Sequence, residues 1–163
     1  MAIVIGYQGV GKSTMCRKHN DCIDLESSSF WFKDANNNPK RWDNWADIYG
    51  NIAEHLSNQG NIVCIASHFV VRERLKNTNE KVIVVVPGLD IKDRWVKRLY
   101  YRYLDTATEK DYKAWMNAGE KYEQDIKALM DDAKKYGWKL VIIKLKDLDQ
   151  DLFDKICYAM GEK

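Results

Sequence analysis

Short apolar runs alternate along the chain with longer segments in which apolar residues recur every three or four positions. The short runs are rich in β-branched residues and lack polar alternation, which is typical of strands buried on both faces. We predict five such strands, at residues 2–5, 22–25, 62–66, 82–86 and 140–145. The pattern therefore predicts an α/β fold, in which helices cover both faces of a parallel sheet.

Helical spacing fills most of the sequence between these runs. We expect helices at residues 12–19, 42–56, 70–75, 91–103, 109–136 and 152–160. In the second helix Trp42, Trp45 and Tyr49 fall on one face, where packing is the default role of aromatic side chains and base stacking the alternative. The Asn-Asn-Asn-Pro segment at 36–39 predicts a turn. Without an internal repeat or a linker, residues 1–163 are expected to form one domain.

Composition narrows the class of protein. The 163 residues contain 26 Lys and Arg against 24 Asp and Glu, a net charge of +2. This balance argues against a protein that coats nucleic acid, although it leaves room for a local basic patch. No run of eighteen apolar residues predicts a membrane span. The four cysteines lack CxxC spacing, so we expect reduced thiols in a cytoplasmic protein.

One motif carries clear chemistry. Residues 6–13, Gly-Tyr-Gln-Gly-Val-Gly-Lys-Ser, lie between the first predicted strand and helix and match G-x-x-x-x-G-K-[ST]. Glycines let several backbone N–H groups converge on one phosphate, Lys12 supplies a mobile cation, and the Ser13 hydroxyl can ligate Mg²⁺. The residues expected to bind ATP here are Gly9, Val10, Gly11, Lys12, Ser13 and Thr14.

Two carboxylates follow the second strand. Asp24 and Glu26 are two residues apart, so both are expected to project together at the carboxyl edge of the sheet, where ligands bind in open α/β folds. They could hold Mg²⁺ through water, or one could accept a proton from an attacking hydroxyl. The third strand ends in Ser67 without the usual acid. We therefore assign metal binding to Ser13 and Asp24, with Ser67 as a polar substitute.

A row of arginines follows the fourth strand. Arg94, Arg98 and Arg102 recur every four residues and so share one face of a helix. Such a row repels itself unless an anion neutralises it, and its expected use is to clamp the phosphates of donor and acceptor. The alternative is a solvated basic face paired with nearby aspartates.

The acceptor side is less well marked. Arg41 precedes the second helix and is a weaker candidate for binding an acceptor phosphate. His68 could touch the substrate or cap the following helix, and Arg72 is either a phosphate ligand or a surface residue. Trp45 is a further candidate, through stacking on a base. With Glu26, these residues are the expected substrate contacts.

Together the glycine-rich motif, the Asp-x-Glu pair and the arginine helix resemble the nucleoside and nucleotide kinase group of P-loop proteins, most of all the compact phage-encoded deoxynucleoside monophosphate kinases. The resemblance spans nearly the whole chain, although only residues 6–13 are specific. It implies a three-layer P-loop NTPase fold with strand order 2-3-1-4-5. It also implies ATP and Mg²⁺ as cofactors, a nucleotide as partner, and a location in the host cytoplasm.

The same resemblance implies a helical lid at about residues 90–118, with Arg94, Arg98 and Arg102 as lid arginines and residues 42–56 walling the acceptor pocket. The missing third-strand acid departs from many members of the group. Oligomeric state is left open, a homodimer included.

We therefore expect an ATP-dependent phosphotransferase that phosphorylates a (deoxy)nucleoside monophosphate, chiefly by positioning and charge neutralisation. The expected catalytic residues are Lys12, Arg94, Arg98, Asp24 and Glu26. Three alternatives remain. A nucleoside or other small-molecule hydroxyl kinase would use Glu26 or Asp24 as base. A nucleotide-binding switch would transfer nothing, and the chain lacks an N-K-x-D motif for base reading. A polynucleotide 5′-kinase should need a larger basic groove.

Overall fold

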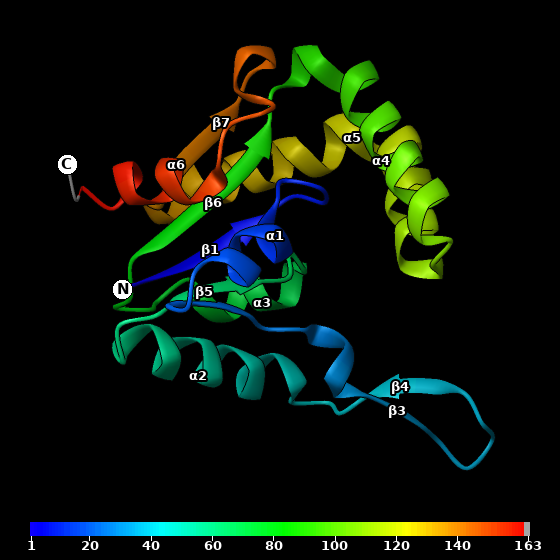
Figure 1. Cartoon of the computed structure of the whole chain (residues 1–163). Helices are drawn as coiled ribbons and strands as arrows, with labels where there is room; N and C mark the ends of the chain where they lie inside the picture. The colour runs from blue at the N-terminus through cyan, green and yellow to red at the C-terminus, as the bar shows by residue number, and fades with distance from the viewer. Residues whose placement is uncertain (162–163) are drawn as a thin grey trace.

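A computed structural model describes residues 1–161. Its centre is a parallel sheet of five strands: β1 (Ala2–Gly6), β2 (Cys22–Asp24), β5 (Ile62–Ile65), β6 (Val82–Pro87) and β7 (Lys139–Ile143). The strands lie in the order β2-β5-β1-β6-β7 (Figure 1). Counted along the sheet strands alone, this is the predicted 2-3-1-4-5 order, so the predicted α/β fold is confirmed.

Helices cover both faces of this sheet. They are α1 (Lys12–Lys18), α2 (Trp45–Asn58), α3 (Phe69–Leu75), α4 (Lys92–Thr106), α5 (Glu109–Tyr136) and α6 (Leu152–Ala159). Helices α1 and α6 meet each other, while α2 packs on β5 and β1 and α5 packs on β6. Strands β1, β5 and β6 are buried along their whole length, as their unbroken apolar runs predict. Within the described residues, no helix combines the length and apolar character that crossing a membrane requires.

Helices α4 and α5 form a helical hairpin beyond the carboxyl edge of the sheet, comprising residues 92–121. The two helices join at Ala107, whose backbone is left-handed (φ 51°). Rings from both helices pack together, including Tyr100 against Trp115 with centroids 4.9 Å apart. Helix α5 is broken at Lys121, where φ is −128° and ψ is 16°. The break lets the first half of α5 pair with α4 while the second half lies against the sheet.

A second projection, the β-hairpin, joins β2 to α2 and was not predicted. Two antiparallel strands form it, β3 (Trp31–Lys33) and β4 (Pro39–Arg41), after a short 3₁₀ helix η1 (Ser27–Phe30). The predicted turn at 36–39 lies at its tip, where Asp34 accepts hydrogen bonds from the backbone N–H groups of Asn36 and Asn38, both at 2.9 Å. Figure 1 shows the β-hairpin extending away from the sheet.

The β-hairpin corrects the expected start of the second helix. Helix α2 begins at Trp45, so Trp42 lies before the helix rather than on its aromatic face. Arg41 lies within β4. The last predicted strand also ends earlier, because Leu145 lies in the 3₁₀ helix η3 (Leu145–Asp147) instead of β7. A further 3₁₀ helix, η2 (Leu89–Ile91), immediately precedes α4 at the start of the helical hairpin.

Candidate nucleotide site

The glycine loop, residues 6–13, leaves the carboxyl end of β1 in the middle of the sheet. Gly9 and Gly11 have φ values of 84° and 103°, a left-handed region that side chains with a Cβ rarely adopt. Gly11 precedes the first turn of α1, so the N–H groups of that turn face the loop. A curled backbone leading into a helix N-terminus is a suitable cradle for phosphate oxygens.

Lys12 folds back over this loop. Its Nζ donates a hydrogen bond to the Gly6 carbonyl at 2.7 Å and lies 3.4 Å from the Ile65 carbonyl. Withdrawal of the ammonium from water lowers the pKa of Lys12, and the positive charge of Lys110 lowers it further. The ammonium is therefore held by two neutral carbonyls, and no carboxylate of residues 1–161 forms an ion pair with it. An incoming phosphate would supply the missing negative charge.

Ser13 and Asp24, the two residues assigned to metal binding from the sequence, contact each other. The Ser13 hydroxyl donates to the Asp24 carboxylate at 2.6 Å, which joins the first turn of α1 to the end of β2. The neighbouring Thr14 hydroxyl instead accepts from Arg17 at 3.3 Å. Among residues 1–161, no group of three or more His, Cys, Asp or Glu side chains could hold a metal ion by itself. The Ser13–Asp24 pair fits Mg²⁺, which commonly takes one or two protein oxygens together with substrate phosphates and water.

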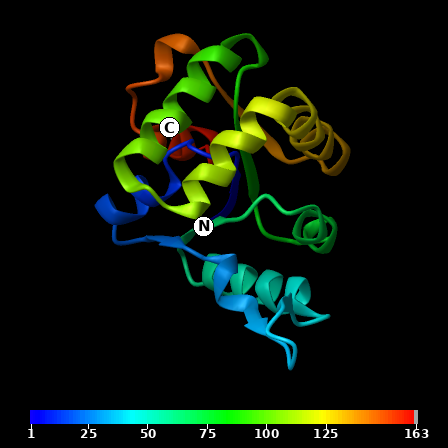
Figure 2. The same cartoon turned by 90° about the vertical axis from the view of Figure 1, so that its right-hand side faces the viewer.

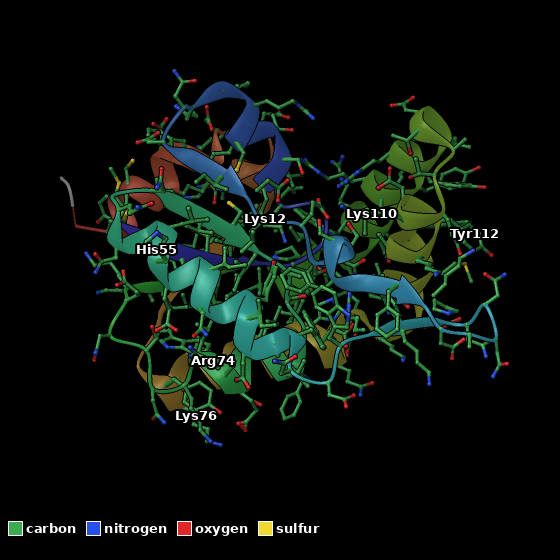
Figure 3. All side chains as sticks on the ribbon, turned by 90° about the horizontal axis from the view of Figure 1, so that it is seen from below. Lys12, His55, Arg74, Lys76, Lys110 and Tyr112 are labelled. Atoms are coloured by element: carbon green, nitrogen blue, oxygen red, sulfur yellow. The ribbon has the colours of Figure 1, made fainter. Side chains whose placement is uncertain are left out.

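Glu26 faces a different partner from Asp24. Its carboxylate lies 3.0 Å from the Nζ of Lys110, which reaches from the first turn of α5 toward the segment after β2 (Figure 3). This contact joins the helical hairpin to the second strand near Lys12. Lys110 was not predicted as a site residue, because its run of mixed charge, Glu-Lys-Asp-Tyr-Lys, is typical of a solvated helix face. The two predicted carboxylates thus serve separate contacts.

Helix α4 is tied to the glycine loop by a tryptophan. The indole Nε1 of Trp95 donates to the Gln8 carbonyl at 2.8 Å, and the ring is almost fully buried. One turn later, Leu99 packs so close that a Cβ added at Gly9 would meet its Cδ2 at 2.9 Å. The loop is therefore supported from the helical hairpin as well as from the sheet. Neither contact has a signal in the sequence, since Trp95 and Leu99 read as ordinary apolar positions of an amphipathic helix.

The three arginines of α4 have different surroundings. Arg98 lies 5.2 Å from the centroid of the Trp95 ring and donates to the Leu148 carbonyl at 3.4 Å. Arg102 pairs at 2.9 Å with Asp111, a buried carboxylate of α5. Arg94 is exposed. The row is therefore tied partly into the helical hairpin, and Arg98 is the member associated with the tryptophan that supports the loop.

Arg41 lies at the centre of an aromatic cluster on the other side of the loop. Its guanidinium carbon lies 4.4 Å from the Trp31 ring centroid and 4.2 Å from that of Trp45. The same guanidinium is 3.4 Å from both the Ser27 hydroxyl and the His68 Nε2. Its Nε is buried and has no hydrogen-bond partner among the described residues. A buried donor without an acceptor is costly, and an anionic oxygen would satisfy it.

His68 and Arg72, two further predicted substrate contacts, differ in charge and in their partners. Burial lowers the pKa of His68, and the charges of Arg41 and Arg72 lower it further, so the ring is neutral at neutral pH. Arg72 is buried and bonds the Asp132 carboxylate at 2.5 Å and the Ser67 carbonyl. These contacts join α3 to α5, so the guanidinium is used in packing. The burial of Arg72 excludes the alternative of a surface residue, and its role as a phosphate ligand stays a prediction.

Figure 2 looks onto the carboxyl edge of the sheet and shows the helical hairpin and the β-hairpin on opposite sides of it. No protein-family model matches the chain, and no curated protein matches it either. A glycine loop lies between two projections, one bearing Lys110 and Arg98 and the other bearing Arg41.

Proposed function

We propose that the protein is an ATP-dependent phosphotransferase whose acceptor is a (deoxy)nucleoside monophosphate, as in the P-loop kinases that its sequence resembles. The observation that carries the proposal is the arrangement at the end of β1. There, two left-handed glycines shape the loop, Lys12 folds over it, and the Ser13 hydroxyl bonds Asp24 at 2.6 Å. A loop, a cation and a hydroxyl–carboxylate pair at one sheet edge suit a triphosphate better than any other common ligand.

The donor would bind with its β- and γ-phosphates in the glycine loop. Backbone N–H groups and the N-terminus of α1 favour negative charge there, and Lys12 can exchange its carbonyl partners for phosphate oxygens. Mg²⁺ bound with the nucleotide would neutralise part of the phosphate charge, held through Ser13 with Asp24 behind it. The lowered pKa of Lys12 favours this exchange, because the buried ammonium gains an anionic partner.

The acceptor would bind on the side of the β-hairpin. The buried, unpartnered Nε of Arg41 offers a donor for an acceptor phosphate, and Ser27 and His68 lie beside the same guanidinium. Cation–π contacts with the Trp45 and Trp31 rings hold the guanidinium in place. A phosphate acceptor needs no strong base, since its oxygen is already ionised at neutral pH. Transfer then depends on positioning and on cations around the moving group.

Lys110 is the cation best placed to act from the helical hairpin. It pairs with Glu26 at 3.0 Å, and its charge acts on Lys12. A γ-phosphoryl group between the two lysines would attract both ammonium groups. Arg98, supported on the Trp95 ring, is the second candidate from this side.

The direct test is a transfer assay with labelled ATP and a panel of nucleosides, nucleoside monophosphates and 5′-hydroxyl oligonucleotides. We expect product from at least one monophosphate, and no product from the Lys12→Ala variant. The matched control is Lys18→Ala, an exposed lysine at the end of the same helix, which should keep wild-type activity. Normal transfer by Lys12→Ala would contradict the proposal.

The panel also separates the other functions. Turnover of a nucleoside that is lost in Glu26→Gln or Asp24→Asn would identify a hydroxyl kinase with that carboxylate as base. ATP binding without turnover of any acceptor would favour a nucleotide-dependent switch. Failure to bind ATP or GTP with Mg²⁺ would remove the basis for all of these functions.

A further inference from the structure

We propose that Tyr49 is a positioning residue, whose hydroxyl holds the carboxyl ends of β2 and β5 apart and so opens the acceptor side of the site. The part of this inference that concerns phosphoryl transfer rests on the function proposed above. The separation of the two strand ends rests on hydrogen bonds alone.

The Tyr49 hydroxyl is inserted between two backbone groups. It donates to the Leu25 carbonyl at 2.5 Å and accepts from the Ala66 N–H at 2.9 Å. Leu25 directly follows β2, and Ala66 directly follows β5. The tyrosine itself comes from α2 and is fully buried. One hydroxyl therefore links three elements at the carboxyl edge of the sheet.

The two backbone groups are the ones that would otherwise continue the strand pairing. Strands β2 and β5 are parallel, and the Ile62 N–H donates to the Asp21 carbonyl at 2.8 Å, as the Leu25 N–H does to the Cys64 carbonyl at 2.9 Å. Bonds of a parallel pair are evenly spaced and recur every two residues, so the next one would run from the Ala66 N–H to the Leu25 carbonyl. The hydroxyl takes the place of that bond, and the pairing of the two strands ends there.

Beyond this point the two segments carry the proposed acceptor contacts. Glu26 and Ser27 stand just past β2, and His68 stands just past β5. The Ser27 hydroxyl and the His68 Nε2 are 3.5 Å apart, and the Arg41 guanidinium lies 3.4 Å from both. The distance between the strand ends therefore sets the spacing of the groups that would meet the acceptor.

The hydroxyl is kept neutral and fixed in place. Burial raises the pKa of Tyr49, and the charges of Glu26 and Asp24 raise it further. A neutral hydroxyl can donate one bond and accept another at the same time, as this position requires. The rings of Phe30 and Trp45 pack on the tyrosine, with centroids 5.5 and 5.8 Å away. A packed ring with a proton on its oxygen is a suitable spacer.

The test is Tyr49→Phe, which keeps the ring and removes only the oxygen. In a crystal structure of this variant we expect the Ala66 N–H and the Leu25 carbonyl to bond directly, at about 2.9 Å. Because a displacement of about 1 Å can cost about 10²-fold in rate, kcat/KM for the monophosphate should fall at least about tenfold. The KM for ATP should stay within about twofold of wild type, because the hydroxyl has no bond to the glycine loop.

The matched control is Ser57→Ala. Ser57 is also fully buried on α2, and its hydroxyl donates to the Glu80 carboxylate at 2.7 Å, two helical turns beyond Tyr49. Both variants lose a buried hydroxyl with a hydrogen bond, so both should lower Tm by a few degrees. Only Tyr49→Phe should lower kcat/KM for the acceptor. A role in stability alone would give the two variants the same kinetics.

Three results would overturn the inference. The first is a structure of Tyr49→Phe in which the strand ends keep their separation, with a water in place of the hydroxyl. The second is a kcat/KM for the acceptor within about threefold of wild type. The third is an equal rise in KM for ATP and for the monophosphate, which would indicate a general loss of structure.

Failure of the proposed function would look different. A wild-type protein that transfers phosphate to no acceptor would refute that function. The crystal structure of Tyr49→Phe would then still decide whether the hydroxyl separates the strand ends.

Discussion

Removing the ion pair between Lys110 and Glu26 should affect stability and catalysis to very different extents. Replacing Lys110 by Ala removes one cation from the first turn of α5 and leaves the packing of the helical hairpin in place. The side chains of Lys110 and Glu26 are 67% and 45% exposed and lie 3.0 Å apart. An ion pair this open to water is well screened, so its contribution to the free energy of unfolding is small.

The expected effects differ strongly in size. Loss of an exposed pair costs about 0.2–1 kcal/mol. For a domain of this length each kcal/mol moves Tm by about 2–4 °C, so Lys110→Ala should lower Tm by no more than about 4 °C. If the ammonium stabilises the transferring phosphoryl group, the same change should lower kcat by about 10²-fold or more.

The assay compares kcat, KM and Tm for three variants under identical conditions. Lys113→Ala is the matched control, because Lys113 is also 67% exposed and pairs with Glu109 at 3.1 Å on the same helix. It should lower Tm to a similar extent while kcat stays at the wild-type value. Lys110→Arg should recover part of the rate because it keeps the charge. A kcat for Lys110→Ala within about threefold of wild type would refute the reasoning.

Three further changes test other parts of the site. Gly9→Ala should cost about 1–2 kcal/mol and weaken ATP binding, because φ is 84° and the new Cβ would meet Leu99 at 2.9 Å; unchanged thermal unfolding would contradict this. His68 has a lowered pKa in the fold, chiefly through burial and then Arg41, whereas in the unfolded chain it protonates near its ordinary value of about 6.5. Below that pH the unfolded chain therefore binds more protons than the folded one, and the free energy of unfolding falls as the pH drops. In urea titrations the His68→Asn variant should lose less of this free energy than wild type between about pH 7 and 5. Arg98→Ala should lower kcat about 10²-fold, and an effect confined to KM would assign it to ground-state binding.

Much of the sheet could be predicted because its signals are local. The run at Val82–Pro87 is long, apolar and β-branched, and such a run has few alternatives to a buried strand. The β-hairpin was missed because each of its strands has three residues and most of its side chains are exposed, which leaves no apolar run to find. Its turn at Asn37 was predictable, since asparagine tolerates the left-handed conformation seen there (φ 63°).

The candidate site also contains residues that local sequence could place and residues that it could not. The glycine loop and the Ser13–Asp24 pair could be predicted, because a motif of fixed spacing and the end of a neighbouring strand place them. Lys110 meets Glu26 across 84 positions of sequence, and Trp95 meets Gln8 across 87. Contacts over such separations depend on how the helical hairpin packs, and neither residue type marks them in the sequence. Arg41 was a candidate from the sequence, but its contacts with the Trp31 and Trp45 rings depend on the β-hairpin, which was not predicted.

The attachments of the helical hairpin restrict how it can swing. Its first turn is held at Gln8 by Trp95, and just beyond Lys121 the Tyr122 hydroxyl donates to the Gly88 carbonyl at 2.7 Å. The base is thus fixed at two points, while the exposed Lys110–Glu26 ion pair links the region near the tip at Ala107 to the segment after β2. If the helical hairpin closes over a bound nucleotide, as a lid would, the interrupted turn at Lys121 would be its pivot. The hydrogen bond from Trp95 to the Gln8 carbonyl also couples the glycine loop to α4. A bound phosphate that moved Gln8 would therefore move the start of α4 as well.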